Sequence, residues 1–240
     1  MCETDRVSHS AAAETRRERL ERARLYLVSD ARSGRGDLAE LLRAAIEGGV
    51  EIVQLREKQL RGEALLRAAE AARRICAEHG ALFIIDDMPA LAGALDADGV
   101  HLGQEDMGAA QARTLLGPEP LIGLSTHTPA QIEQAGSLPI DYIGVGPVFA
   151  TPTKPGRDAV GTALIGHAAA RARMPFFAIG GLAEANIAAV LRAGATRVAV
   201  VRAITTAADA CAAAQALRRA LDRGTVGARE PAVEAGIGAR

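Results

Sequence analysis

Three polar side chains with anion-binding chemistry stand together at the end of one short apolar run. In the segment Gln54-Leu55-Arg56-Glu57-Lys58, the alternation of side chains along a strand puts Gln54, Arg56 and Lys58 on one face. An arginine fork and a lysine point charge suit a diphosphate. The alternative is a solvated charge cluster in which Glu57 pairs with its cationic neighbours, because charges are common at strand ends.

Carboxylates follow the next two apolar runs. Asp86 and Asp87 end one run and Asp106 follows the other, so that carboxylates of neighbouring strands can face one ion. Mg²⁺ takes few protein oxygens when it is shared with a phosphate, and the pattern predicts a magnesium and diphosphate site. Alternatively, Asp87 caps a helix that begins near Met88-Pro89. The cations of the preceding run favour the metal, because cations and carboxylates aimed at one place need both an anion and a metal.

A long loop and a glycine pair add two candidate anion sites. The loop after the sixth run carries Thr151, Thr153 and Lys154, which can hold a phosphate or stabilise a leaving diphosphate. The alternative is a surface loop stiffened by prolines. Gly180-Gly181 follows the seventh run, where a barrel commonly holds a phosphate on backbone N–H groups, although such a pair also simply turns a chain.

Nucleophilic catalysis is not indicated by the histidines and serines. His101 lies within an apolar run and is interpreted as a hydrogen-bonded core residue rather than a ligand. His127 follows the fifth run and is a candidate for a secondary contact. The segment Ser125-Thr126-His127 is too short to indicate a covalent mechanism.

The elements that must position these residues alternate between two kinds. Eight short runs have the length and composition of buried parallel strands, and begin at Arg24, Glu51, Leu82, Gly99, Leu121, Asp141, Pro175 and Arg197. Segments with helical spacing follow them, among them 37–47, 62–79, 183–193 and 207–221. Eight such units in about 200 residues predict a single-domain (β/α)₈ barrel, with the chemistry at the strands' carboxyl ends. A doubly wound sheet is the alternative, but residues 29–34 lack its glycine-rich fingerprint.

The ends of the chain read differently from this central part. We assign residues 23–222 to the barrel, residues 1–22 to a polar leader that is either a frayed helix or disordered, and residues 223–240 to a flexible tail.

Composition excludes several classes of partner. With 28 basic and 29 acidic residues the net charge is -1, and aromatic residues make up 2%, which argues against nucleic acid. No apolar stretch of about 18 residues indicates a membrane span. The cysteines at 2, 76 and 211 form no metal or disulfide pattern, so we expect a cytoplasmic protein that acts on small molecules. The sequence leaves room for a homo-oligomer.

Several of these motifs, in the same order, resemble the thiamine phosphate synthase family. The resemblance runs from about Arg24 to Leu221 and is carried by residues 54–58, 86–87, 101–106, 123–127, 146–147, 151–154 and 178–181. It implies a (β/α)₈ barrel that joins 4-amino-2-methyl-5-hydroxymethylpyrimidine diphosphate to a thiazole phosphate, forming thiamine phosphate and diphosphate. The implied reaction is dissociative: diphosphate leaves first, and the thiazole nitrogen attacks the pyrimidine cation.

The resemblance also implies the roles of individual residues. Catalytic roles in stabilising the departing charge fall on Arg56, Lys58 and Lys154 together with Mg²⁺. The pyrimidine diphosphate is expected at Gln54, Arg56, Lys58, Asp86, Ser125 and Lys154, the Mg²⁺ at Asp87 and Asp106, and the thiazole phosphate at Thr151, Thr153, Gly181, Val201 and Arg202.

Two positions depart from the family's commonest pattern. Asp86 stands where Asn is usual, and we hypothesise that it either joins the metal shell or is kept protonated by like-charged neighbours. Arg202 stands where Ser is frequent and would give the thiazole phosphate a direct cation. The rival functions are a thiazole tautomerase, against which Asp87, Asp106 and Lys154 speak, and a catalytically silent binding protein, for which Asp86 leaves room. A phosphosugar isomerase would need a glutamate base at a late strand end, and none stands out.

Overall fold

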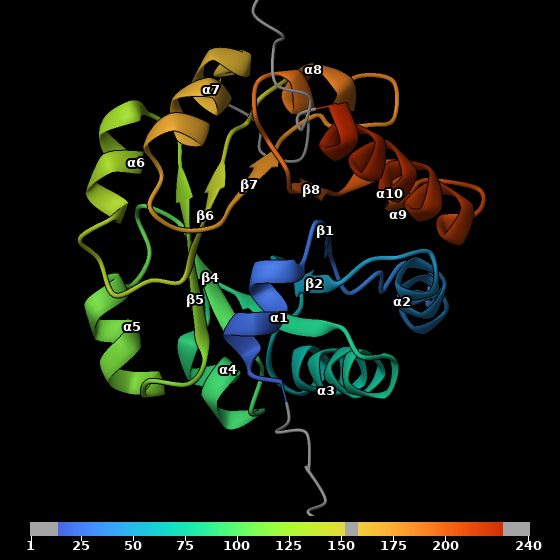
Figure 1. Ribbon diagram of the computed structural model, residues 1–240. Coiled ribbons are helices and arrows are strands. Elements are labelled where there is room, and N and C mark those ends of the chain that lie inside the picture. Colours follow the sequence, from blue (N-terminus) through green and yellow to red (C-terminus); the bar gives the residue numbers. More distant parts are fainter. Residues whose placement is uncertain (1–13, 152–157, 228–240) are drawn as a thin grey trace, which may run out of the picture.

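Eight parallel strands close into one barrel in the computed structural model, which describes residues 14–151 and 158–227 (Figure 1). Each strand pairs with its neighbours in chain order, and β8 closes the sheet by pairing with β1, with Leu25 opposite Val198. The strands are β1 (Leu25–Ser29), β2 (Ile52–Leu55), β3 (Leu82–Asp86), β4 (Gly99–Leu102), β5 (Leu121–Thr126), β6 (Tyr142–Val145), β7 (Phe176–Ile179) and β8 (Val198–Val200). The predicted fold is confirmed, and each predicted run contains a strand.

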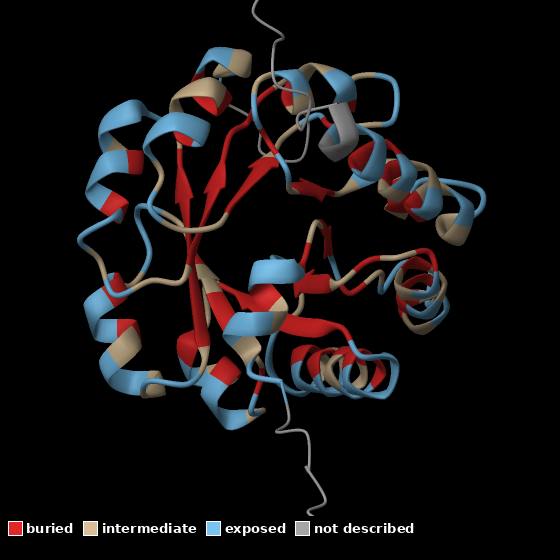
Figure 2. Ribbon diagram, viewed as in Figure 1, coloured by how far each residue is buried: buried red, intermediate tan, exposed pale blue. Residues whose placement is uncertain are grey.

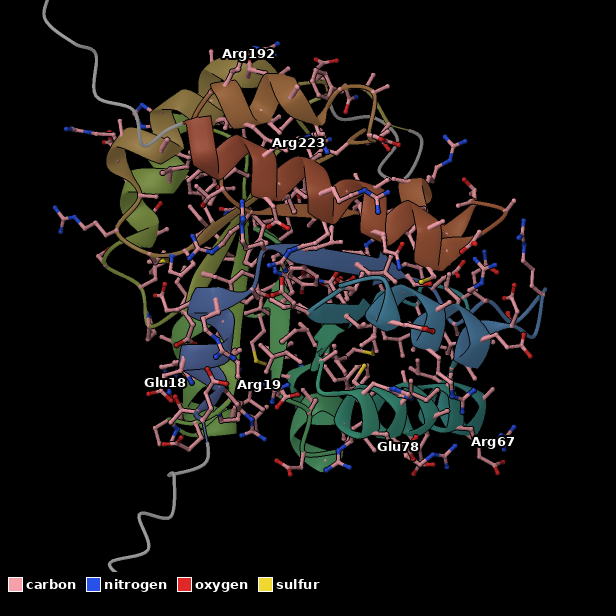
Figure 3. The ribbon with its side chains drawn as sticks, turned by 45° about the vertical axis from the view of Figure 1, so that its right-hand side comes forward. Glu18, Arg19, Arg67, Glu78, Arg192 and Arg223 are labelled. Atoms are coloured by element: carbon pink, nitrogen blue, oxygen red, sulfur yellow. The ribbon has the colours of Figure 1, made fainter. Side chains whose placement is uncertain are left out.

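Helices surround the sheet and present their exposed faces outward (Figures 1 and 2). They are α1 (Arg16–Arg22), α2 (Leu38–Glu47), α3 (Gly62–His79), α4 (Pro89–Ala94), α5 (Ala109–Leu116), α6 (Pro129–Ala135), α7 (Gly161–Arg171), α8 (Ile187–Arg192), α9 (Arg202–Thr205) and α10 (Ala210–Gly227). Charged side chains such as Arg67 and Glu78 on α3 point away from the barrel (Figure 3). None of the described helices is long and apolar enough to cross a membrane.

The alternation of side chains along the strands divides the buried residues into two clusters. One, which includes Val53, Phe83 and Ile143, packs between the sheet and the helices. The other fills the barrel interior and includes Tyr26, Tyr142 and Phe177. Strands covered on both faces read as continuous apolar runs, which is why the sequence marked them clearly.

Helix α1 lies across the amino-terminal end of the barrel, within the residues assigned to the leader (Figure 1). Thr15 and Glu18 form a capping box that starts the helix, and Leu20 is buried among the interior residues. Arg16 pairs with Asp98, just before β4, in one of several ion pairs that hold the helix. At the other end of the chain, α10 continues past the predicted boundary at residue 222.

Two helices differ from their predicted bounds by more than one residue. The predicted helix over 183–193 begins only at Ile187, because the Asn186 side chain accepts a hydrogen bond from the Ala183 backbone and holds a turn there. The predicted helix over 207–221 runs over Ala210–Gly227 instead. Gly80 caps the carboxyl end of α3 with a left-handed backbone, at a φ of 74°.

Candidate active site

A cavity of about 500 Å³ opens at the carboxyl ends of the strands. Most of the predicted site residues that the structure describes line it, namely Gln54, Arg56, Asp86, Ser125, Thr151, Gly181, Val201 and Arg202. Lys58 lines an adjoining cavity of about 350 Å³, and Arg56 borders both. Thr153 and Lys154 lie outside the described residues. The structure therefore brings together side chains from positions 54 to 202 of the chain, as expected for a barrel mouth.

The cations of the segment 54–58 are not paired with Glu57, contrary to the alternative interpretation of this segment. The Glu57 side chain is buried and accepts hydrogen bonds from the backbone N–H groups of Ala31 (3.0 Å), Gln59 (2.6 Å) and Leu60 (3.0 Å). It therefore ties the loop after β2 to the loop after β1. Burial alone would raise the pKa of Glu57, but the backbone donors outweigh it and hold the pKa below its ordinary value.

Replacing this carboxylate is expected to loosen both loops. Glu57→Gln turns one acceptor oxygen into an N–H donor that faces backbone donors, which should lower the free energy of unfolding by about 1–3 kcal/mol. A depressed folded-state pKa stabilises the protein above the unfolded pKa, and that contribution is lost as the pH falls through the folded pKa. Urea unfolding at pH 7 and in mild acid measures this, and the gap between the two proteins should narrow in acid. A constant gap would contradict the role of the charge.

Asp86 ends β3 between the two cations. Its Oδ2 atom lies 3.1 Å from Nζ of Lys58 and 3.3 Å from Nε of Arg56. Burial, reinforced by the charge of Asp87, raises the pKa of Asp86 to about 6 against the opposing effect of Lys58 and Arg56. Arg56 and Lys58, which follow β2, are thus both in contact with the carboxylate that ends β3.

Asp87 and Asp106 form a carboxylate pair that is more exposed than Asp86. Asp87 has a left-handed backbone with a φ of 58°, donates its N–H to the carbonyl of His101, and pairs through its side chain with Lys58. Burial opposes ionisation, but hydrogen bonds with Asp106 and Lys58 hold the pKa of Asp87 below its ordinary value. The hydrogen bond with Asp87 and partial burial raise the pKa of Asp106. The helix-cap alternative for Asp87 is wrong, because Met88 occupies the N-cap of α4 and the Asp87 side chain pairs with Lys58 instead.

These carboxylates fit a divalent cation. The buried Asp86 Oδ2 has no hydrogen-bond partner of good geometry, and two further carboxylates meet beside it despite their like charges. In the described part of the chain, no group of three or more His, Cys, Asp and Glu residues forms a complete protein-only metal site. Mg²⁺ characteristically uses one or two carboxylates and takes its remaining ligands from substrate phosphate and water. Asp87 and Asp106 match that pattern.

The floor of the cavity contains residues that the sequence analysis missed. Tyr26, Tyr142 and Phe177 point inward from β1, β6 and β7, and their rings pack edge to face or tilted, with centroids 5.3–6.1 Å apart. His101 was predicted to be a hydrogen-bonded core residue, and it does lie on this floor, 3.0 Å from Oγ of Ser125. The sequence contains a pattern that could have predicted these floor residues, because all of them occupy the alternate strand positions that face the barrel interior.

The opposite wall of the cavity is backbone-rich. Gly180 and Gly181 follow β7 with φ values of 105° and 65°. A Cβ on Gly180 would come within 2.4 Å of Cα of Pro147, so the glycine pair lets the chain pass close to the loop after β6. Val201 and Arg202 follow β8 on the same side. His127 also borders the cavity, with Nδ1 2.5 Å from the Gly146 carbonyl.

A known protein family has the same sequence pattern. The family described as "Thiamine monophosphate synthase" matches residues 25–204, from β1 to α9. The chain belongs to this family. The thiamine-phosphate synthase of Thermobifida fusca is 52% identical over 211 residues, which cover 87% of this chain and 96% of that protein. That of Mycobacterium sp. (strain KMS) is 50% identical over 216 residues, with coverage of 84% and 94%.

Solved structures share the barrel fold of this chain. A thiamine phosphate pyrophosphorylase from Pyrococcus furiosus superimposes with a TM-score of 0.77 at 31% identity, over 87% of this chain and 98% of that one. A 3-hexulose-6-phosphate synthase gives a TM-score of 0.59 at 23% identity, over 82% and 99%, and shares the fold alone.

Proposed function

We propose that the protein is a thiamine phosphate synthase that joins 4-amino-2-methyl-5-hydroxymethylpyrimidine diphosphate to 4-methyl-5-(2-phosphooxyethyl)thiazole. The bond between the pyrimidine methylene carbon and the diphosphate oxygen breaks, and its electron pair leaves with diphosphate. The lone pair of the thiazole nitrogen then forms the new carbon–nitrogen bond, which gives thiamine phosphate. The observation that supports this most directly is the meeting of Arg56 and Lys58 with Asp86 and Asp87 at the mouth of an apolar cavity.

Different residues of the site stabilise the departing diphosphate and orient the pyrimidine ring. Arg56 and Lys58 supply the positive charge that stabilises the departing diphosphate, and Lys154 is proposed to add to it. Gln54 and Ser125 orient the pyrimidine ring above the aromatic floor. Mg²⁺, held by Asp87 and Asp106, would neutralise charge on the diphosphate.

The thiazole phosphate is proposed to bind on the wall formed by Gly181, Val201 and Arg202, with Thr151 and Thr153. The left-handed glycines allow a phosphate to approach the backbone closely. The two anions would thus lie on opposite sides of the apolar floor, with the reacting carbon and nitrogen between them.

A direct assay tests the proposal. The purified chain is mixed with both phosphorylated substrates and Mg²⁺, and thiamine phosphate is followed as fluorescent thiochrome, with and without EDTA. Metal-dependent product is the expected result. Binding of both substrates without product would favour a silent binding protein, and isomerisation of the thiazole alone would favour a tautomerase.

Asp86→Asn is expected to lower the Mg²⁺ concentration needed for half-maximal rate by about threefold or more. The substitution removes a carboxylate that lies against Lys58 and Arg56, so that both cations can face the diphosphate and help to hold its metal complex. Magnesium titrations of the initial rate measure the effect. An unchanged or higher magnesium requirement would contradict this role for Asp86.

Arg202→Ser is expected to raise the KM for the thiazole phosphate by about tenfold and to spare the KM for the pyrimidine diphosphate. Arg202 is exposed at the cavity rim and begins α9, on the wall away from the Asp86 cluster. A charged hydrogen bond to phosphate contributes about 1.5–3 kcal/mol. Equal changes in both constants, from initial rates at varied substrate, would refute the assignment.

Location and assembly are further parts of the proposal. A cytoplasmic site of action accords with the substrates and with the cysteine pattern, and the protein is proposed to act without a nucleic-acid or membrane partner. Light scattering during size-exclusion chromatography measures whether the chain forms a homo-oligomer.

A further inference from the structure

A chain of hydrogen bonds crosses the barrel interior beneath the cavity and links five strands. Gln54 Nε2 lies 2.8 Å from Oη of Tyr26, and the two tyrosine hydroxyls lie 3.0 Å apart. Oη of Tyr142 lies 3.3 Å from Nδ1 of His101, whose Nε2 lies 3.0 Å from Oγ of Ser125. The two residues at the ends of this series of hydrogen bonds, Gln54 and Ser125, are buried and border the cavity.

The chain has one consistent direction when Gln54 donates. Tyr26 accepts from the Gln54 amide, so its own proton goes to Tyr142. The Tyr142 proton then goes to Nδ1 of His101, and the neutral imidazole carries its proton on Nε2 and donates it to Ser125. The Ser125 hydroxyl is left with its proton for the cavity, while Gln54 is left with its carbonyl oxygen and one N–H.

Reversing only part of this series of hydrogen bonds leaves a buried group without a partner. If His101 donated to Tyr142, then Tyr142 would donate to Tyr26, which already accepts from Gln54. The buried Tyr26 proton would then lack an acceptor among the hydrogen bonds of this chain, at a cost of about 1–3 kcal/mol. Burial also raises the pKa of both tyrosines, which keeps their hydroxyls protonated. Reversing the direction requires the Gln54 amide and every link up to Ser125 to turn together.

We propose that Tyr26, Tyr142 and His101 are positioning residues that couple the hydrogen-bonding directions of Gln54 and Ser125, so that the cavity offers an acceptor at Gln54 and a donor at Ser125. This inference rests on the proposed function, because it concerns the ring that binds there. A 4-aminopyrimidine has a donor amino group and acceptor ring nitrogens, which match these two ends. A 4-oxopyrimidine offers an acceptor in place of the amino donor, so it would face the Gln54 carbonyl oxygen acceptor to acceptor unless every hydrogen bond from Gln54 to Ser125 reversed. The chain therefore selects the amino ring.

Removing one hydroxyl from the middle of the series of hydrogen bonds separates this role from simple packing. In Tyr142→Phe the ring and its edge contact with Phe177 remain, but the Tyr26 proton becomes free to go to the Gln54 carbonyl. The Gln54 amide can then turn and donate to a 4-oxo group. Tyr26→Phe removes the partner that orients Gln54 and should act in the same direction. Phe177→Leu is the matched control, because it alters the same aromatic cluster without touching a hydroxyl.

The measurement uses two unreactive probes with the full-length chain and Mg²⁺. These are the monophosphates of the 4-amino and 4-oxo hydroxymethylpyrimidines, whose inhibition constants are compared in each protein. We expect wild type and Phe177→Leu to prefer the amino probe by about tenfold or more, and the two tyrosine variants to prefer it by less than about threefold. Thermal unfolding of each variant identifies those that are folded.

The outcomes separate the inference from the proposed function. Unchanged discrimination in a folded tyrosine variant, or an equal loss in Phe177→Leu, would overturn the coupling. Absence of discrimination in wild type would overturn it as well. Absence of thiamine phosphate formation by wild type from the amino diphosphate would instead refute the function. Tyr26→Phe keeps the test decisive if Tyr142→Phe fails to fold.

Discussion

Asp87→Asn should lower kcat/KM for thiamine phosphate formation by about 100-fold or more and raise the magnesium requirement. The substitution removes one of the two proposed metal carboxylates and the charge that pairs with Lys58. Asp87 acts through the metal that it is proposed to hold, and loss of one preorganised group that stabilises a developing anion typically reduces the rate by about 100- to 1000-fold. Asparagine keeps the shape of the side chain, so the change isolates the charge. Initial rates over a magnesium titration measure both effects.

The backbone at Asp87 dictates the choice of variant. Its φ of 58° is left-handed, a conformation that Asn and Asp adopt more readily than other residues with a Cβ. Asp87→Ala would add backbone strain to the loss of charge and confuse the two. Strain here would also affect the hydrogen bond from its N–H to the His101 carbonyl.

Asp96 provides a matched control for this experiment. It is an aspartate with a left-handed φ of 46°, and it pairs with a cation, Arg16 of α1, as Asp87 pairs with Lys58. It is exposed and lies at the amino-terminal end of the barrel, away from the cavity. Asp96→Asn should therefore leave kcat/KM and the magnesium requirement unchanged. A similar loss of activity in both variants, or full activity of Asp87→Asn, would remove Asp87 from the proposed metal site.

The barrel was predictable from the sequence because its strands are buried on both faces. Every strand appears as an apolar run, and the helix α3 was predicted with its observed bounds, Gly62–His79. Helix α1 has a local start signal in its capping box, but its place on the barrel could not be predicted, because it is held there by ion pairs with residues far along the chain, such as that of Arg17 with Asp141. Contacts at that separation have no local signature.

Part of the site was predictable for a similar reason. Residues such as Arg56 and Asp86 immediately follow or end a strand, so the fold alone places them at one mouth. The role of Glu57 was not predictable, because its partners are backbone N–H groups of two loops rather than the neighbouring cations. The hydrogen-bonded floor requires the strand alternation to be combined with the register, which only the structure supplies.

Gly123→Ala is expected to lower the free energy of unfolding by about 3 kcal/mol and to abolish binding of the pyrimidine. Gly123 lies on β5, in register with His101 on one side and Tyr142 on the other. A Cβ at this position would lie 2.2 Å from Cζ of Tyr142 and 2.5 Å from Nδ1 of His101. The hydrogen bond between those two side chains forms only because residue 123 has no side chain. Neither buried ring can move away without cost in a close-packed interior.

Gly144→Ala tests whether this effect comes from the overlap rather than from the loss of any strand glycine. Gly144 lies on β6, in register with Ser125, and its nearest neighbour to an added Cβ is Cε1 of His101 at 3.4 Å. That is close to an ordinary contact, so Gly144→Ala should change stability by less than about 1 kcal/mol. For Gly123→Ala, the midpoint of thermal unfolding should fall by about 6–12 °C. Equal midpoints for the two variants would mean that the tyrosine and histidine have room to move, and that the floor of the cavity is not fixed by Gly123.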